Sequence, residues 1–172
     1  MDVKTIGVIG ATALGRGIAY VAALGGYRTL LEDVSSHRLE DGVAYIAQTL
    51  GAGVASGKIT PDEKARALAN LATAHSVEEV CREADLLIEA APEDMEMQLE
   101  IFTLFDKFAK PGTILATSAS GLSIADLAEI TFCPEQCVGL RFFHPVPETG
   151  QLEIVRAAAT SESTVRACIE AG

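Results

Sequence analysis

Two glycines near the N-terminus have the spacing of a phosphate-binding turn. An apolar run ends in the segment Gly10-Ala11-Thr12-Ala13-Leu14-Gly15, and an amphipathic stretch begins there. The first glycine permits a tight turn, and the last lets a helix approach the strand closely. The helix start offers unpaired N–H groups and a partial positive charge, which suit a pyrophosphate. The segment is therefore a candidate for dinucleotide binding, although its middle position holds Thr12 instead of a third glycine.

About twenty positions after this turn, a second apolar run ends in Glu32 and Asp33. The Asp33 carboxylate can accept hydrogen bonds from both hydroxyls of a nucleotide ribose and would repel a 2′-phosphate. This favours NAD over NADP, although Arg38 supplies a nearby cation. The Thr12 side chain crowds the approach of a diphosphate, yet its hydroxyl can donate to a phosphate oxygen. The alternative to a cofactor site is a Rossmann-like core with an empty crevice.

The composition is that of a globular domain. The chain has 172 residues, of which 49% are hydrophobic and 22% charged, and its formal net charge is −11. This charge argues against nucleic acid or an anionic membrane as a partner, because binding a polyphosphate backbone needs clustered Lys and Arg. No apolar stretch is long enough to span a membrane, and the N-terminus has no signal-peptide pattern. We therefore expect a cytoplasmic protein.

The four cysteines do not predict a metal site. Cys133 and Cys137 form a C-x-x-x-C pair, and no histidine pattern accompanies them or the other two, Cys81 and Cys168. We expect reduced thiols and no bound metal.

Strand and helix patterns alternate along the chain, which predicts an α/β fold. Helix starts are predicted at Ser35 or Ser36, at Pro61, at Ser76 with its capping-box partner Glu79, and at Ser123 with Asp126. The expected architecture is a Rossmann-like, doubly wound and mostly parallel sheet with a helical excursion after the second strand. That excursion is either a solvated pair of helices or part of a ligand site.

Glycine and proline mark further features of this fold. Residues 51–57 are expected to break the excursion, although their alanines could let the helix continue. Pro145 and Pro147 are expected to hold the chain extended. Ligands in such sheets bind beyond the carboxyl ends of the strands. These ends are expected at Gly10, Asp33, residues 90–92, residues 118–121 and residues 143–144.

Four segments resemble a known family in the same order. They are GVIGATALGRGIAYVAALGGYRTLLEDVS, ADLLIEAAPEDMEMQLEIF, PGTILATSASGLSI and GLRFFHPVPETGQLEIV, and the resemblance covers about residues 3–167. It is a resemblance to the N-terminal, NAD-binding domain of L-3-hydroxyacyl-CoA dehydrogenases. It implies NAD as the cofactor, a hydroxyacyl substrate, and hydride transfer between NAD and a secondary alcohol.

The resemblance also implies roles for single residues. Ser120 matches a serine that hydrogen-bonds the substrate hydroxyl, and Glu153 matches a glutamate that orients the catalytic histidine. Glu93 matches a glutamate near the nicotinamide ribose, and Gln98 stands where the family has a lysine that serves cofactor and CoA. The expected cofactor-binding residues are then Gly10, Thr12, Ala13, Leu14, Gly15, Asp33, Glu93, Gln98 and Ser120.

The proton-transfer position departs from the family. Where the family has G-L-H-F-F-N-P, with the histidine as base, this chain has Arg141 at the histidine and His144 at the asparagine. A guanidinium cannot act as a general base near neutral pH. One hypothesis is that His144, three residues away, has taken over the role. The other is that Arg141 pairs with Glu153 or binds an anionic part of a different substrate.

Three functions remain open at this point. They are an NAD-dependent dehydrogenase of the 3-hydroxyacyl-CoA type, a catalytically degenerate nucleotide-binding domain, and a hydroxy-acid dehydrogenase that does not act on CoA esters. The change to Gln98 and the cation at Arg141 suit a small carboxylate. Residues 1–160 are expected to form the dinucleotide-binding domain. Residues 161–172 are expected to begin a linker or the helical C-terminal domain, through which the family forms homodimers.

Overall fold

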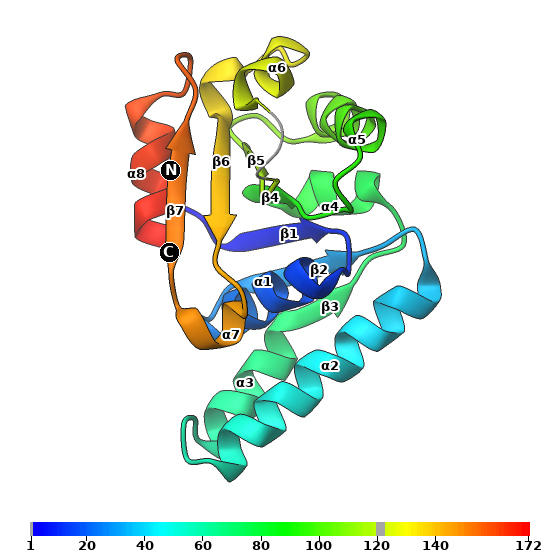
Figure 1. The fold of residues 1–172 in the computed structure, drawn as a ribbon, viewed down its shortest axis with the longest axis vertical. Helices are drawn as coiled ribbons and strands as arrows, with labels where there is room; N and C mark the ends of the chain where they lie inside the picture. Colours follow the sequence, from blue (N-terminus) through cyan, green and yellow to red (C-terminus); the bar gives the residue numbers. More distant parts are fainter. Residues whose placement is uncertain (1, 120–122) are drawn as a thin grey trace.

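The computed structural model of the chain describes residues 2–119 and 123–172. Figure 1 shows a single sheet with helices packed around it. The elements in chain order are β1 (Thr5–Ile9), α1 (Ala13–Leu24), β2 (Arg28–Glu32), α2 (Ser36–Ala55), α3 (Pro61–Asn70), β3 (Leu71–Thr73), α4 (Val77–Glu83), β4 (Leu86–Glu89), α5 (Met95–Phe108), β5 (Ile114–Thr117), α6 (Ile124–Glu129), the 3-10 helix η1 (Pro134–Gln136), β6 (Cys137–Phe142), α7 (Val146–Thr149), β7 (Leu152–Arg156) and α8 (Glu162–Ala171).

The strands of the described residues form one seven-stranded sheet in the order β3-β2-β1-β4-β5-β6-β7. Neighbouring strands are parallel except β6 and β7, which are antiparallel. This confirms the predicted Rossmann-like, doubly wound, mostly parallel sheet. The chain moves outward from β1 to β3 and then crosses to β4 on the other side of β1. The carboxyl ends of β1 and β4 therefore flank the switch point, where ligands bind in such sheets.

Helices cover both faces of the sheet and divide the core in two. One buried cluster packs Val8 and Leu31 against α1, α2, α3 and α8. The other packs Ile9 and Leu30 against α4, α5 and α6. Because successive strand residues point to opposite faces, β1 is buried along its whole length, as expected for a strand covered on both sides.

The helical excursion after β2 consists of α2 and α3, which extend away from the sheet in Figure 1. The side chain of Ser35 caps α2 by accepting a hydrogen bond from the N–H of Arg38. Pro61 occupies the first position of α3, as predicted, after a capping box between Thr60 and Glu63. Of the two outcomes expected for residues 51–57, the helix continues, because α2 extends to residue 55.

The prediction of an extended connection at Pro145 and Pro147 holds for the backbone of Pro145 and is wrong for Pro147. The chain there forms the short helix α7, with Pro145 at its N-cap and Pro147 in its first turn. Proline fits both places because the N–H groups at a helix start have no partner within the helix. The N–H groups of Glu148 and Thr149 both donate to the carbonyl oxygen of Pro145, which closes the turn.

Two predicted helix caps form only in part. Ser123 stands at the N-cap of α6, but its side chain makes no capping hydrogen bond. Ser76 accepts from the N–H of Glu79 as predicted. The Glu79 carboxylate, however, accepts from the N–H of His75 instead of that of Ser76. Both helices still begin where the sequence predicts, because position and backbone geometry suffice to start them.

The last helix packs on the same core as the sheet. Thr164, Ala167 and Cys168 of α8 are buried, and the Thr164 hydroxyl donates to the carbonyl oxygen of Glu135 at 2.8 Å. The domain boundary expected at residue 160 stays a prediction. No helix in the described part of the chain is both long and apolar enough to cross a membrane.

Candidate functional site

Gly10 and Gly15 lie where no side chain would fit. Gly10 has a φ of 104°, and a Cβ built on it would lie 2.7 Å from the carbonyl oxygen of Ala90. A Cβ on Gly15 would lie 1.8 Å from the carbonyl oxygen of Gly10. The start of α1 therefore contacts the end of β1 through backbone atoms alone. This is the close approach that the glycine spacing predicts.

Thr12 acts as the N-cap of α1. Its hydroxyl accepts a hydrogen bond from the N–H of Gly15 at 3.1 Å and donates to the carbonyl oxygen of Ala90 at 2.8 Å. The hydroxyl proton that was expected to suit a phosphate oxygen is thus used within the protein. Among the described residues, no hydrogen bond uses the N–H groups of Ala13 and Leu14. These two donors, at the positive end of α1, suit a pyrophosphate.

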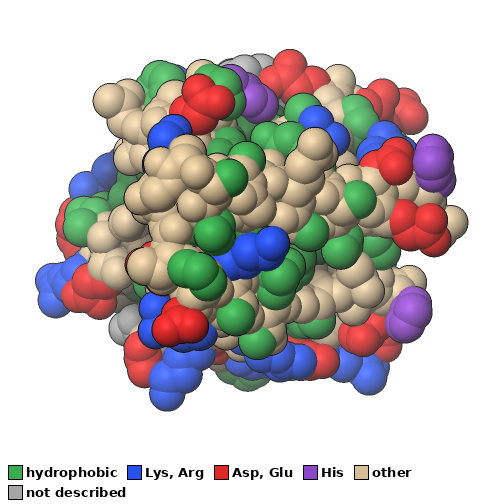
Figure 2. All heavy atoms as spheres, turned by 90° about the horizontal axis from the view of Figure 1, so that it is seen from below, with side chains coloured by type: hydrophobic (Ala, Val, Ile, Leu, Met, Phe, Trp, Pro, Cys, Tyr) green, Lys and Arg blue, Asp and Glu red, His purple; other side chains and the backbone are tan. Residues whose placement is uncertain are grey.

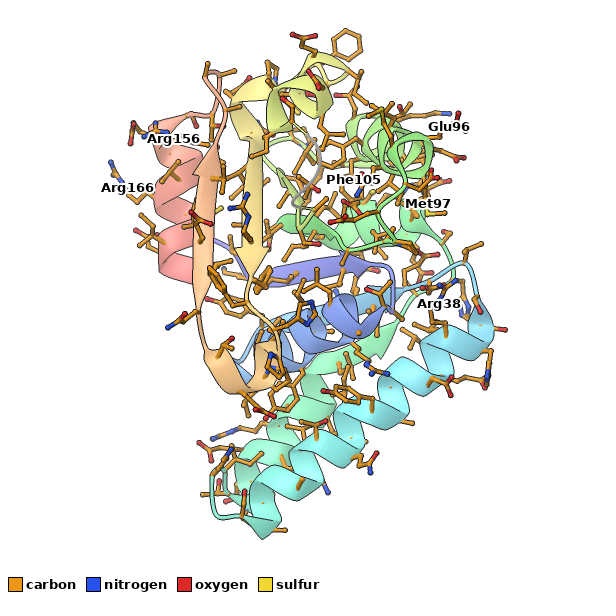
Figure 3. All side chains as sticks on the ribbon, in the orientation of Figure 1. Arg38, Glu96, Met97, Phe105, Arg156 and Arg166 are labelled. Atoms are coloured by element: carbon orange, nitrogen blue, oxygen red, sulfur yellow. The ribbon has the colours of Figure 1, made fainter. Side chains whose placement is uncertain are left out.

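Asp33 joins the glycine loop to the start of α2. Its carboxylate accepts from the N–H of Ala11 at 2.9 Å and from the N–H of Ser35 at 2.8 Å. The Nε of Arg38, which Figure 3 shows at the start of α2, donates to the same carboxylate at 3.1 Å. The Asp33 side chain is only 4% exposed. The residue expected to meet the ribose hydroxyls therefore also holds the loop in place.

Glu32 is a second buried acid beside Asp33, and sequence reasoning did not single it out. It is 6% exposed, and within the described residues no hydrogen bond reaches its carboxyl group. Burial, together with the negative charge of Asp33, raises the pKa of Glu32 to about 7. The sequence signal that could have drawn attention to Glu32 is that two acids, Glu32 and Asp33, end the apolar strand. One acid would be enough to bind a ribose.

Glu89 is a third buried acid, at the end of β4, and it is fully partnered. Its carboxylate accepts from the hydroxyl of Thr117 at 2.7 Å and from the N–H of Ala91 at 2.8 Å. The side-chain amide of Gln98 donates to it at 3.4 Å. Burial raises the pKa of Glu89 in spite of these donors. Only tertiary structure could identify this residue, because its partners come from three different segments.

The other predicted cofactor residues lie in different environments. Gln98 is buried and its side-chain amide donates to Glu89, and a direct contact with the cofactor stays a prediction. Glu93 is exposed in the connection between β4 and α5. Ser120 lies outside the described residues.

Arg141 and Glu153 form an ion pair. They lie directly opposite each other in the antiparallel register of β6 and β7. The NH1 of Arg141 donates to the Oε2 of Glu153 at 2.9 Å, and both side chains are about half exposed. The pairing hypothesis therefore matches the geometry. An exposed pair of this kind contributes roughly 0 to 1 kcal/mol to stability.

His144 is not part of this pair. It lies in the exposed connection between β6 and α7. Within the described residues, its side chain makes no hydrogen bond or ion pair with Arg141 or Glu153. A histidine base that Glu153 orients is thus absent from the described geometry, and a catalytic role for His144 stays a prediction.

The rest of the described residues give no sign of a metal site. Among the described residues, no group of His, Cys, Asp and Glu side chains is placed to hold a metal ion. The four cysteines are free, and burial raises the pKa of each thiol.

On the face shown in Figure 2, acidic and basic side chains are interspersed. The expectation that the chain binds no nucleic acid stays a prediction.

The chain matches a known family along almost its whole length. The family model described as 3-hydroxyacyl-CoA dehydrogenase, NAD binding domain, matches residues 5–172. The chain belongs to this family. This confirms the family that the four sequence segments resemble. The backbone cradle at Gly10 and Gly15 and the two N–H donors at the start of α1 fit that cofactor.

Several relatives carry related names. A 3-hydroxybutyryl-CoA dehydrogenase of Bradyrhizobium diazoefficiens is 38% identical over 98% of this chain and 57% of its own length. A 3-hydroxyadipyl-CoA dehydrogenase of Escherichia coli is 35% identical over 99% of this chain and 36% of its own. A solved 3-hydroxybutyryl-CoA dehydrogenase of Escherichia coli has a TM-score of 0.94 at 34% identity, covering 99% of this chain and 36% of that one. The chain thus spans about a third to three fifths of these relatives.

The close approach at Gly15 predicts a large effect of one methyl group. In Gly15→Ala, the new Cβ must push α1 away from β1, because the atom it meets is a backbone oxygen 1.8 Å away. We expect a loss of about 2 kcal/mol or more in the free energy of unfolding, together with weakened NAD binding. Urea unfolding and calorimetry with NAD measure the two effects.

A matched control for this variant is Gly51→Ala, within α2. A Cβ there meets nothing closer than the Lys64 amine at 3.5 Å. Alanine is the better helix former by roughly 0.5 to 1 kcal/mol, so the control should be slightly more stable than the wild type. Equal stability of the two variants would contradict the close approach.

The raised pKa of Glu32 predicts a pH-dependent stability. The group has a pKa of about 7 when folded and an ordinary value of 4.5. Its contribution to stability is therefore complete below about pH 4.5 and is lost as the pH rises through about 7. Between about pH 5 and pH 8 the wild type should lose on the order of 2 kcal/mol that Glu32→Gln does not.

Urea unfolding at a series of pH values measures this difference. The control is Glu40→Gln, the same change at an exposed position of α2, which should follow the wild type. If Glu32→Gln and the wild type lose stability in parallel, the buried carboxyl is not the source of the effect.

Proposed function

We propose that the chain is the cofactor half of an NAD-dependent oxidoreductase that interconverts a 3-hydroxyacyl-CoA and its 3-keto form. The names of its relatives support a short hydroxyacyl substrate, since the Bradyrhizobium relative at 38% identity is a 3-hydroxybutyryl-CoA dehydrogenase. The observation that carries the proposal is the glycine cradle at Gly10 and Gly15, continued by Asp33 at the end of β2. NAD, when bound, supplies the hydride acceptor.

The residues of this half bind and orient the cofactor. The N–H groups of Ala13 and Leu14 would hold the pyrophosphate, and Asp33 would receive the ribose hydroxyls at the end of β2. The ring that accepts the hydride then lies toward β4, β5 and β6, because the other half of the dinucleotide occupies the β2 side. The substrate would then lie near Arg141 and Glu153.

The pair Arg141 and Glu153, where the family has its proton-transfer residues, favours a second candidate function. This is a nucleotide-binding domain with weak or lost catalysis. A guanidinium cannot act as a general base, and that of Arg141 is bonded to Glu153, so it cannot take a proton from a hydroxyl. His144 and Ser120 remain the other predicted participants. A third candidate is a hydroxy-acid dehydrogenase. The half-exposed Arg141 would suit it, because the guanidinium could also meet a substrate carboxylate.

Two further expectations stay predictions. A homodimer would form through the helical C-terminal domain that the resemblance implies. A cytoplasmic location is expected from the sequence, and the relatives also include a mitochondrial enzyme of Sus scrofa.

The experiment that separates these functions restores the base. In the full-length protein, Arg141→His should place an imidazole opposite Glu153, because the register of β6 and β7 already pairs the two positions. NADH-linked reduction of acetoacetyl-CoA should then rise by roughly 100-fold, within the range that general acid–base catalysis contributes. Calorimetry should give the same NAD affinity before and after the change.

The matched control is Arg141→Lys, which keeps the charge and should stay as slow as the wild type. Wild-type turnover that already equals that of Arg141→His, and that falls in His144→Ala, would make His144 the base. No turnover in any variant, with NAD still bound, would leave the nucleotide-binding domain. Absence of NAD binding would rule out both enzymes.

A further inference from the structure

The Asp33 carboxylate, which is expected to meet the ribose hydroxyls, is covered by the chain's own donors. The N–H group of Ala11 donates to its Oδ2, and that of Ser35 donates to its Oδ1. The Nε of Arg38 lies 3.1 Å from both oxygens. Only 4% of the Asp33 side chain is therefore exposed, although it stands at the end of β2, where a dinucleotide ribose binds in such folds.

A ribose cannot use this carboxylate fully while Arg38 stays in place. A carboxylate has about four lone-pair positions, shared equally by its two oxygens. The N–H groups of Ala11 and Ser35 take one position on each oxygen. The two ribose hydroxyls need the other two, which the Nε of Arg38 already shares. Binding of a ribose at Asp33, as the proposed cofactor site requires, therefore displaces the Arg38 guanidinium.

The displaced guanidinium stays close to the ribose, because its backbone is fixed. Arg38 lies in the first turn of α2, and its N–H donates to the capping hydroxyl of Ser35. Its side chain is 43% exposed, and within the described residues only its Nε makes a hydrogen bond or an ion pair. The two terminal nitrogens are free to meet a ligand. Their planar fork matches the oxygens of a phosphate group.

We propose that Arg38 binds the 2′-phosphate of NADP, so that the site accepts NADP as well as NAD. In NADP the phosphate replaces the 2′-hydroxyl that Asp33 would otherwise receive, and Asp33 alone would repel it. The Arg38 guanidinium, which the ribose displaces from Asp33, supplies the opposite charge at that place. Asp33 therefore recognises the unmodified ribose, and Arg38 extends the range of the site to the phosphorylated one.

The test measures the dissociation constants of NAD and NADP by calorimetry in the full-length protein. We expect the wild type to bind the two dinucleotides within about tenfold of each other. In Arg38→Ala, NADP loses its cation, and NAD no longer has to displace a side chain. The ratio of the NADP to the NAD dissociation constant should then rise by about tenfold or more. Arg38→Lys, which keeps the charge without the planar fork, should give an intermediate ratio.

The matched control is Arg28→Ala. Arg28 is the first residue of β2, at the opposite end of the strand from Asp33, and it pairs with Glu83. This variant loses the same charge and should keep the wild-type ratio. Asp33→Asn, which removes the repulsion, should lower the ratio. Circular dichroism and thermal unfolding confirm that each variant is folded.

The outcomes separate this inference from the proposed function. A wild type that binds NAD and gives no measurable binding of NADP overturns the role of Arg38, as does a ratio that is unchanged in Arg38→Ala. An equal rise in Arg28→Ala also overturns it, because net charge would then set the ratio. In these three cases the NAD site stands. Failure of the wild type to bind NAD at all overturns the cofactor site and this inference with it.

Discussion

The site depends on one contact between backbone atoms, the approach of the start of α1 to the end of β1. It is so close that the Cβ of any residue at Gly15 would meet the carbonyl oxygen of Gly10. Three side-chain hydrogen bonds hold the start of α1 and the end of β1 together. The Thr12 hydroxyl donates to the carbonyl oxygen of Ala90, and the Asp33 carboxylate accepts from the N–H groups of Ala11 and Ser35. A helix start fixed in this way presents its N–H groups at the switch point without further ordering when an anion binds.

The features that the sequence predicts well are local ones. Gly10 and Gly15, the cap at Ser35 and the start of α3 at Pro61 follow from conformational rules that a short stretch obeys regardless of its surroundings. The Arg141–Glu153 pair was one of the hypotheses for position 141, and it came from the resemblance to the family, which has its dyad there, and not from a local rule. The glycine turn and the two helix starts needed no knowledge of which elements pack together.

The features that the sequence did not predict depend on packing between distant segments. Glu32 and Glu89 became notable only once their burial was known, and Gln98 turned inward because Glu89 lies below it. The helix α7 was missed because proline was treated as a residue that extends the chain. Proline is also tolerated in the first turn of a helix, and that is where Pro147 lies.

The antiparallel pairing of β6 with β7 makes position 141 tolerant of substitution. Because the backbone register alone brings position 141 opposite Glu153, the chemistry of this pair can change with one substitution and no rearrangement of the fold. The ion pair is exposed and contributes little to stability, so such a change is nearly neutral for folding. A substitution at position 141 can therefore change the charge at this edge of the sheet while the glycine turn and Asp33 stay as they are.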